Sequence, residues 1–508
     1  MKKLYTIVSL MLSSLSIMAT DFKDCSMAIK SNISTNIEKS NTTVSINGRT
    51  FSINGLKYDN TDLGNVELTN LQIIDGYSDG TMVYATSEPQ YITIGGEKVA
   101  ANFRGEVRNS KFRGILNLTI NGSNYIAMIG DKADELGQLP NAGFEEFHTA
   151  TVTIKDLLAP SGTFKSDEPN SWHSFQSATG SKKKYVGSSI DTYKEDNDKR
   201  TGSTDKRCVK IQSSIVKVVG IEKPANGTMT TGRLYAGSTS AIDPANNSTM
   251  DFADKDKDGN GDPFYPIFTT KPDAMTVWVK FKGNVKDHPN ATVKAILAND
   301  RVQDPEKDDY KKNVIARAAN KQTESKNFAW QELNIPFKYE NKNTPKGMLV
   351  TISTNAEAGK ASSDKNNLDV IYVDDIAMIY NSGLKSAQYK NTNLSFANNK
   401  TAIEIEGKAN EADFSIASDG EGAYISKVLK TNESETGKST LYITITSNDL
   451  QKSNCFEVAI TDKTATGIFN IKNDSNATSS TLYNLAGQQV SNSYKGIIIK
   501  NGKKYINK

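Results

Sequence analysis

The sequence is poor in the residues that build disulfide frameworks and zinc hydrolases. Its three cysteines, Cys25, Cys208 and Cys455, stand far apart, which argues against a disulfide framework. The three histidines are equally scattered, and none belongs to a His-Glu-x-x-His motif. A phosphate loop of the Walker type is also missing. These motifs therefore give no argument for catalysis.

The chain also lacks an excess of charge and a long hydrophobic run. Its 61 basic residues face 58 acidic ones, a formal net charge of +3, so it has no electrostatic field suited to nucleic acid. The apolar run Leu4–Met18 is shorter than the roughly 20 residues that a membrane span needs. Lys2 and Lys3 precede this run and Ala19 follows it. This pattern predicts a secretory signal peptide over residues 1–19 and a secreted or outer-surface location.

Short alternating strands and tight turns dominate the first part of the mature chain. Leu116, Leu118 and Ile120 alternate with polar neighbours. Asn-Gly pairs tolerate the positive φ of tight hairpins, and they occur at Asn47-Gly48, Asn54-Gly55 and Asn121-Gly122. An antiparallel meander with one solvent-exposed face can remove its open edges by closing into a small β-barrel. We predict such a barrel over residues 20–131. Residues 132–139 are predicted to be a linker.

Two short segments predict the two ends of a jelly-roll β-sandwich over residues 140–381. The opening segment is Asn141–Glu146, where a turn leads into an apolar strand that carries acids, and the closing segment is Ile371–Ile376. Between them come four further segments with strand or turn signals: Glu168–Phe175, Thr231–Gly237, Lys271–Phe281 and Trp330–Phe337. The charged tracts between these segments predict long surface loops.

The rest of the chain also has the composition of short strands. Alternation in Leu441–Ile445 predicts an immunoglobulin-like β-sandwich over residues 384–462, and residues 465–508 form a terminal β segment. The fold class is therefore all-β and multidomain: an N-terminal small β-barrel, a central jelly-roll β-sandwich, a C-terminal immunoglobulin-like sandwich and a terminal β segment.

Three parts of the chain resemble domains of secreted Bacteroidota proteins. The strands and Ile-Asn-Gly turns of residues 20–131 resemble a calycin-like, or lipocalin-like, β-barrel. The order of segments in residues 140–381 resembles the jelly-roll carbohydrate metabolism domain of surface proteins. A strand, a Gly turn, an apolar strand and a basic tail at Leu482–Ile506 resemble the C-terminal sorting domain of the type IX secretion system. The last resemblance implies a contact with the secretion machinery or the outer membrane surface; the alternative is a hairpin that completes the preceding sandwich.

The acids of the two end segments predict a calcium site. Neighbouring residues on a strand point to opposite faces, so we expect one acid from each pair to meet, and by position we select Glu145 and Asp375. In carbohydrate-binding jelly rolls of similar pattern, such acids help to hold a structural Ca²⁺ on the convex side. Several oxygen ligands suit this cation. The alternative is that these acids face solvent or cap strand ends.

A second calcium candidate is the acidic loop Asp254–Asp262. Asp254, Asp256 and Asp258 alternate as in an EF-hand loop, and a Gly follows them. The twelfth position is Tyr265 and not Glu, and no amphipathic helix flanks the loop. A helix-free calcium loop and a solvated acidic turn both fit this pattern.

Aromatic and basic residues of the central domain are the candidates for sugar binding. Trp172 lies among polar residues, Trp278 shares a strand face with polar neighbours, and Arg233 follows a Thr-Gly pair. Trp330, beside Leu333 and other apolar residues, is expected to pack in the core instead.

The leading functional hypothesis is a secreted or cell-surface protein that recognises a polysaccharide or other glycan without catalysis of its own. One alternative is a glycoside hydrolase or lyase on the same sandwich, which needs two opposed carboxyls. Another is a structural or adhesive surface protein whose barrel holds a small ligand in an apolar cavity.

Overall fold

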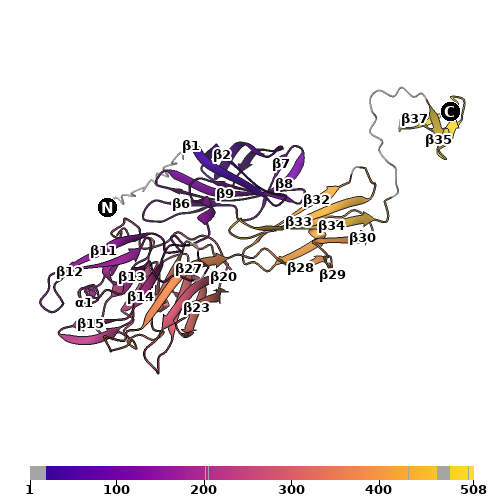
Figure 1. The fold of residues 1–508 in the computed structure, drawn as a ribbon. Coiled ribbons are helices and arrows are strands. Elements are labelled where there is room, and N and C mark those ends of the chain that lie inside the picture. Colours follow the sequence, from indigo (N-terminus) through magenta and orange to yellow (C-terminus); the bar gives the residue numbers. More distant parts are fainter. Residues whose placement is uncertain are drawn as a thin grey trace, which may run out of the picture. The chain divides into compact units, whose positions relative to one another are not determined.

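The computed structural model describes residues 19–200, 202–203, 205–432, 434–465, 481–500 and 503–507, whose regular secondary structure is almost entirely β-strand (Figure 1). The all-β, multi-sheet fold class predicted from the sequence is confirmed. The predicted signal peptide lies outside the described residues, apart from Ala19. None of the helices in the described part of the chain is long and apolar enough to cross a membrane.

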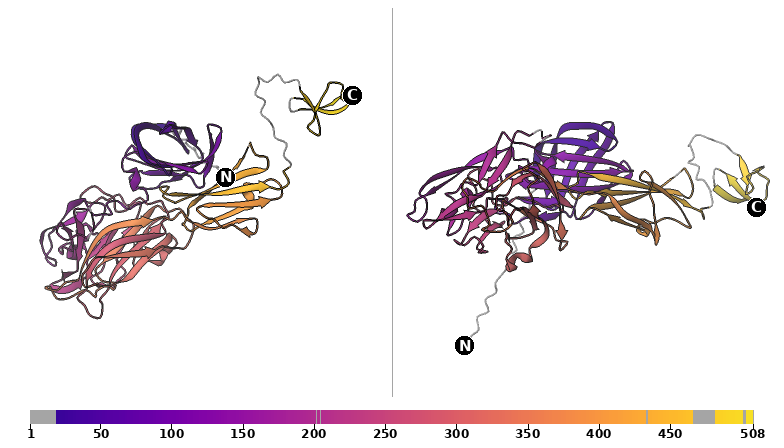
Figure 2. Two further views of the ribbon diagram at one scale, coloured as in Figure 1. Left: turned by 45° about the vertical axis from the view of Figure 1, so that its right-hand side comes forward. Right: turned by 60° about the horizontal axis from the view of Figure 1, so that its bottom comes forward.

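The first sheet has ten strands and curls round on itself (indigo in Figure 2). Its order is β4-β3-β2-β1-β10-β9-β8-β6-β5, with β7 paired to β8. The strands are β1 (Thr20–Ser31), β2 (Ser34–Asn47), β3 (Thr50–Tyr58), β4 (Thr61–Leu68), β5 (Gln72–Ile74), β6 (Met82–Ala85), β7 (Gln90–Ile94), β8 (Glu97–Arg108), β9 (Lys111–Ile120) and β10 (Ser123–Ile129).

Two of the three predicted Asn-Gly turns join strands of this sheet. Gly48 connects β2 to β3, and Asn121-Gly122 connects β9 to β10, each with positive φ. Asn54-Gly55 instead lies inside β3, where the pairing with β4 shifts register. A bulge needs the same permissive backbone as a hairpin turn, which explains why the sequence pattern did not distinguish them.

Side chains fill the interior of this first sheet. The rings of Phe51 and Phe103 stack with centroids 4.0 Å apart, and Phe112 stacks on Phe103 at 6.4 Å. Val44, Leu116 and other apolar residues complete a buried cluster around them. A packed aromatic interior is what a small barrel uses in place of a ligand cavity.

The central domain is a sandwich of two five-stranded sheets. One has the order β13-β14-β27-β20-β24 and the other β17-β26-β21-β23-β25; we call them the first and second face sheets. Their strands are β13 (Thr192–Glu195), β14 (Cys208–Gln212), β17 (Thr228–Thr230), β20 (Ala274–Lys282), β21 (Ala291–Ala298), β23 (Val314–Thr323), β24 (Gln331–Pro336), β25 (Lys338–Tyr339), β26 (Gly347–Ser353) and β27 (Val370–Ile379).

Strand alternation builds the core of this sandwich. Val277, Val279 and Phe281 of β20 point inward and are fully buried, whereas Trp278 and Lys280 point outward. Val350 and Ile352 of β26 meet the inward row from the opposite sheet. This period of two is what a half-buried strand requires.

Smaller elements surround the sandwich. They are the hairpin β11 (Phe147–Ile154) and β12 (Gly162–Pro169), the hairpin β15 (Ser214–Val218) and β16 (Ile221–Ala225), the sheet of β18 (Arg233–Ala236), β19 (Asn246–Met250) and β22 (Val302–Asp304), the short helices α1 (Lys183–Val186) and α2 (Asp308–Lys311), and the 3₁₀ turns η1 (Ala133–Glu135) and η2 (Phe175–Ser177). Hairpins and very small sheets of this kind have little core of their own.

Two further sheets follow the sandwich in sequence. One has the order β29-β28-β31 and the other β30-β34-β33-β32, in which β30 runs parallel to β34. Leu441, Ile443 and Ile445 of β33 are fully buried, as their alternation predicts. The strands are β28 (Leu384–Tyr389), β29 (Thr392–Asn393), β30 (Lys400–Ile405), β31 (Phe414–Ser418), β32 (Tyr424–Thr431), β33 (Lys438–Thr446) and β34 (Ser453–Asp462), with the 3₁₀ turn η3 (Glu411–Asp413) before β31.

The last described residues form a separate sheet of four short strands in the order β36-β35-β37-β38. The strands are β35 (Leu482–Asn484), β36 (Gln489–Val490), β37 (Gly496–Lys500) and β38 (Lys503–Asn507). The predicted strand, Gly turn and apolar strand of this segment are therefore present.

Replacing Phe281 by alanine should lower the unfolding free energy of the sandwich by about 3–5 kcal/mol, because the ring is fully buried in the core. The measurement is urea denaturation followed by tryptophan fluorescence, since all three tryptophans lie within residues 140–381. The matched control is Ile221→Ala on an exposed hairpin, which should change the value by less than about 0.5 kcal/mol. Equal effects of the two substitutions would contradict the assignment of Phe281 to the core.

Candidate functional site

The opening and closing segments of the sandwich do meet at one corner. The Cβ that Gly143 lacks would lie 3.6 Å from an oxygen of Asp375 and 3.6 Å from an oxygen of Asp205. The Oε1 atom of Glu145 accepts hydrogen bonds from the backbone N–H groups of Lys206 and Arg207, at 2.8 and 3.1 Å. The Glu145 carboxylate therefore holds the loop that brings Asp205 to the corner.

Three carboxylates gather at this corner: one oxygen from each of Asp205, Asp374 and Asp375 lies within 4.8 Å of the others. Strand alternation predicts that Asp374 and Asp375 face opposite ways, and the structure corrects this. Asp375 has a positive φ of 43°, and the pairing of β27 with β20 shifts register there. Such a β-bulge places two neighbouring side chains on one site. We call these three residues the aspartate corner.

The electrostatics of the aspartate corner disfavour ionisation of all three carboxyl groups. Asp374 is fully buried, and its Oδ2 has no hydrogen-bond partner among the described residues. Burial and then the charge of Asp375 raise the pKa of Asp374 to about 7. Burial and the same neighbour also raise the pKa of Asp205. One compensating charge is present, because the Arg200 guanidinium pairs with Asp375.

The acidic loop does not converge on one point, which corrects the EF-hand-like prediction. Asp254 and Asp256 both turn to the Arg233 guanidinium, at 3.6 and 2.6 Å. Asp258 turns away from them, to a pair of histidines. The same guanidinium nitrogen, Nη1, thus contacts both Asp254 and Asp256.

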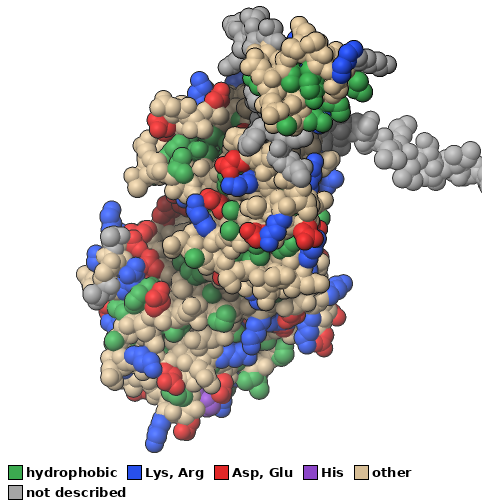
Figure 3. Space-filling view, turned by 90° about the vertical axis from the view of Figure 1, so that its right-hand side faces the viewer, with side chains coloured by type: hydrophobic (Ala, Val, Ile, Leu, Met, Phe, Trp, Pro, Cys, Tyr) green, Lys and Arg blue, Asp and Glu red, His purple; other side chains and the backbone are tan. Residues whose placement is uncertain are grey.

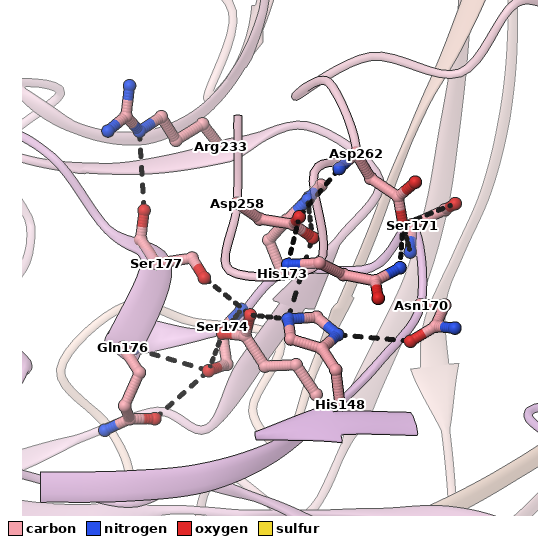
Figure 4. A network of polar contacts seen from close by, with 12 residues as sticks. His148, Asn170, Ser171, His173, Ser174, Gln176, Ser177, Arg233, Asp258 and Asp262 are labelled. Atoms are coloured by element: carbon pink, nitrogen blue, oxygen red, sulfur yellow. Dashed lines mark hydrogen bonds and ion pairs between the residues drawn. The ribbon is translucent and has the colours of Figure 1, made fainter. Parts of the chain in front are cut away.

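Two histidines that are distant in sequence meet around Asp258 (Figure 4). The Oδ2 atom of Asp258 lies 3.4 Å from Nε2 of His173 and 3.7 Å from Nε2 of His148. The Oε2 atom of Glu168 also lies 3.7 Å from Nε2 of His148. We call these four residues the histidine cluster. No spacing motif in the sequence indicates this cluster, because its four residues come from four places in the chain. They lie in β11, in β12, just after β12 and in the acidic loop.

The histidine cluster is almost dry. His173 and Glu168 are fully buried, and the side chain of His148 is only 10% exposed. Although burial opposes ionisation, the contact with His173 lowers the pKa of Asp258. Glu168 accepts hydrogen bonds from the hydroxyls of Ser174 and Ser177 and from the backbone of Ser174. Both carboxylates are therefore held as acceptors.

The tryptophans proposed for sugar binding have other surroundings. Trp172 is fully buried beside Phe144, and its Nε1 donates to the carbonyl of Pro140 at 3.1 Å. Its ring cannot stack on a sugar, so the prediction that Trp172 binds sugar is wrong. That prediction depended on the polar neighbours of Trp172 in the sequence. Trp278 is partly exposed on the outward side of the first face sheet, with Arg200 5.0 Å from its ring.

Arg233 is a bridge between elements and is not free to bind a ligand. Besides its contacts with Asp254 and Asp256, it donates to the carbonyl of Ser177 and stacks on the ring of Phe264 at 4.2 Å. The glycine ahead of Arg233 has its own reason. Gly232 packs so closely on Thr249 that a Cβ there would lie 2.3 Å from a carbonyl oxygen.

A groove of about 570 Å³ lies over the outward side of the second face sheet. Thr292 and Lys294 of β21 and Thr351 and Ser353 of β26 form part of its floor. Its walls come from the β15–β16 hairpin, the β18–β19–β22 sheet and the α1 helix. Sequence reasoning did not find it, because its residues are ordinary polar and apolar side chains from distant segments.

The lining of this groove mixes aromatic, amide and charged groups. Tyr235 is 41% exposed and offers a ring face. Asn246 and Asn247 line the same wall. Nζ of Lys294 lies 3.1 Å from Asp304. Asp304 is the one carboxylate among the described lining residues.

The sequence contains a Gly-x-Ser-x-Gly pentapeptide, Gly76–Gly80, between β5 and β6. Its Ser78 hydroxyl contacts the carbonyl of Asp254 at 2.5 Å and the hydroxyl of Tyr265 at 2.9 Å. A nucleophile elbow needs a strand-to-helix turn, and the described residues place strands on both sides of this turn. The pentapeptide is therefore a structural turn.

Comparison with known proteins adds no assignment: the sequence matches no protein-family model and no curated protein. Lys and Arg are interspersed with Asp and Glu over the face drawn in Figure 3, in keeping with the near balance of charge. The groove, the aspartate corner and the histidine cluster are thus the features from which a function must be argued.

Asp191, below the groove, should make stability depend on pH. It is fully buried, accepts the N–H of Thr228 at 3.0 Å, and burial raises its pKa to about 7. The folded state therefore binds this proton more tightly than the unfolded state, whose pKa is about 3.9. The resulting stabilisation is present below pH 4 and is lost as pH rises to 7.

The measurement is the difference in unfolding free energy between the unmodified chain and Asp191→Asn from pH 4 to pH 8, followed by tryptophan fluorescence. Relative to the variant, the unmodified chain should lose on the order of 3 kcal/mol over this range. Other titrating groups cancel in the difference. A difference that does not change with pH would show that Asp191 has the same pKa in the folded and unfolded states.

Proposed function

We propose that this protein is a non-catalytic glycan-binding protein and that the groove over the second face sheet receives the sugar. The observation that supports it is the groove itself, whose volume of about 570 Å³ falls within the range of about 300–1,000 Å³ that is usual for small-ligand sites. Its lining combines polar groups with apolar side chains such as Val216 and Leu234 and with the exposed ring of Tyr235, and a sugar chain has both kinds of surface.

The chemistry of the lining fits carbohydrate. A pyranose has an apolar face of C–H groups, which can stack on the exposed ring of Tyr235. Its hydroxyls both donate and accept, so they match amides such as Asn246 and Asn247. Neighbouring hydroxyls can donate to Asp304 while accepting from Lys294.

The alternatives have weaker support. Glycoside hydrolysis by the common route uses two carboxyl groups roughly 5–9 Å apart, whereas Asp304 is the one carboxylate in the described lining. An apolar ligand inside the barrel would have to displace the stacked rings of Phe51 and Phe103. Recognition of a glycan at the groove therefore remains the best-supported function.

Calcium at the aspartate corner forms the structural part of the proposal. Asp205, Asp374 and Asp375 carry three negative charges when ionised, and Arg200 compensates one of them. A Ca²⁺ ion would neutralise the remaining two and supply a partner for the buried Oδ2 of Asp374. Glu145 would act indirectly, through the loop that it holds.

We extend the proposal to the location of the protein. The predicted signal peptide supports export, and the sheet β35–β38, with its apolar last strands and basic residues, supports a role as a sorting segment. Its partner would then be the secretion machinery or the outer membrane surface, and the sandwich would meet its glycan outside the cell.

Tyr235→Ala should weaken glycan binding at least tenfold, about 1.4 kcal/mol, because it removes the exposed ring of the groove. A glycan array identifies the ligand, and isothermal titration with the full chain measures the affinity. Trp278→Ala, on the first face sheet, is the matched aromatic control and should leave binding unchanged. The proposal fails if no glycan binds, or if only the Trp278 variant loses binding.

Calcium should raise the unfolding midpoint of the chain, and Asp374→Asn should abolish this effect. At a concentration 100 times its dissociation constant, a ligand adds about 2.7 kcal/mol. Asp254→Asn is the control, because Asp254 faces Arg233 and not the aspartate corner. Retention of the calcium effect in Asp374→Asn, with its loss in Asp254→Asn, would move the site to the acidic loop.

A further inference from the structure

Basic residues outnumber acidic ones in the groove over the second face sheet. Its described lining includes three lysines, Lys182, Lys223 and Lys294, and one acid, Asp304, which gives a net charge of +2. Nζ of Lys294 lies 3.1 Å from each carboxylate oxygen of Asp304, so these two charges compensate each other. The positive charge that remains belongs to Lys182 and Lys223.

Neither of these two lysines has an acidic partner in the part of the chain that the structure describes. Nζ of Lys223 donates to the backbone carbonyl of Thr239 at 3.4 Å, and a carbonyl is a neutral acceptor. Lys182 is half-buried in the groove wall, whereas Lys223 is exposed. The charges of both lysines are therefore available to a ligand.

Acids in the segments around the groove do not supply the missing negative charge. Four of them pair with basic residues outside the described lining: Asp156 with Lys184, Glu222 with Lys365, Glu306 with Arg317 and Glu357 with His288. Asp243 accepts the backbone N–H of Ala245 and does not line the groove. Asp191 is buried beneath the floor, where burial raises its pKa to about 7. The charges of Lys182 and Lys223 are thus left to solvent ions or to a ligand.

Both lysines lie beside the segment that carries Tyr235, the ring that we propose stacks on a sugar. The backbone N–H of Lys182 donates to the carbonyl of Ala236 at 2.9 Å, and Ala236 follows Tyr235 in the chain. Lys223 contacts Thr239, which lies on the same segment. A sugar stacked on Tyr235 would therefore have two positive charges on the same wall, and an acidic substituent on that sugar would gain Coulomb energy from them.

We propose that the glycan bound in the groove is acidic and that its carboxylate or sulfate groups pair with Lys182 and Lys223. This inference rests on the proposed function, because it takes the groove as the glycan site. A lysine ammonium is a compact charge with three donors, so it suits a carboxylate and a sulfate alike. Complementary charge of this kind contributes to specificity and association rate more than to raw affinity.

The β15–β16 hairpin and the α1 helix each offer a control lysine outside the groove. Lys223 is paired with Val216 across the hairpin and both line the groove, whereas Lys217 is exposed and outside the described lining. Lys183, next to Lys182, is likewise exposed and outside the lining. Replacing Lys183 and Lys217 by glutamine removes the same net charge as replacing the two groove lysines. Two such double variants therefore separate pairing in the groove from a general attraction between a polyanion and the chain.

The test is isothermal titration of the full chain with two matched pairs of sugar chains. Oligogalacturonate carries carboxylates that its methyl ester lacks, and dextran sulfate carries sulfates that dextran lacks. We expect at least one acidic chain to bind about 2- to 30-fold more tightly than its neutral counterpart, the combined effect of two exposed ion pairs. The pair that shows the difference identifies carboxylate or sulfate as the recognised group. Added salt should reduce the difference, because it screens exposed charges.

The double variant Lys182→Gln, Lys223→Gln should lose this preference and keep its affinity for the neutral chain, whereas Lys183→Gln, Lys217→Gln should retain the preference. Equal binding of the acidic and neutral members of both pairs, or an equal loss in the two double variants, would overturn this inference. A neutral glycan as the tightest ligand on the array, with binding that needs Tyr235, would also overturn it and would leave the proposed function intact. Absence of binding to any glycan would overturn the proposed function itself.

Discussion

The packing of two inward apolar rows against each other is the constraint on which the rest of the central domain depends. Val277, Val279 and Phe281 from one sheet meet Val350 and Ile352 from the other, and burying such side chains supplies about 25 cal/mol for each Å² removed from water. Because strands alternate, the same pairing turns every second residue outward. The floor of the groove consists of such outward residues, so the core that stabilises the sandwich also arranges the surface proposed to bind a glycan.

A departure from this alternation coincides with the aspartate corner. The bulge at Asp375 places two neighbouring acids on one corner, and the buried oxygen of Asp374 is left without a partner among the described residues. In the histidine cluster, nitrogens and carboxylate oxygens face one another in a dry environment. Buried polar groups are expensive unless they are paired. At the aspartate corner, the cation that we propose would restore the balance.

The acidic loop and the groove also have a mechanical relation. The walls of the groove are hairpins and small sheets, which are marginal by themselves in water. Arg233, at the start of β18, holds the acidic loop through Asp254 and Asp256, and Asp258 of the same loop reaches the histidine cluster. Ionic contacts thus fasten elements that have too little apolar area to pack firmly, and the groove keeps its form through them.

The sequence by itself determined the all-β class, the alternating core strands and the turns at Gly48 and Asn121-Gly122, because these follow from periodicity and backbone preference over a few neighbouring residues. It also indicated that the opening segment lies beside Asp375, although Glu145 holds the Lys206–Arg207 backbone and is not one of the three clustered carboxylates. Only the tertiary structure decided that Asp205 and Asp374 join Asp375 and that Trp172 is a core residue. It also decided that Arg233 pairs with Asp254 and Asp256 of the acidic loop. It alone brought His148 and His173 to Asp258. Such contacts join segments far apart in the chain, and a bulge or a salt bridge between them leaves no periodic signal in the sequence.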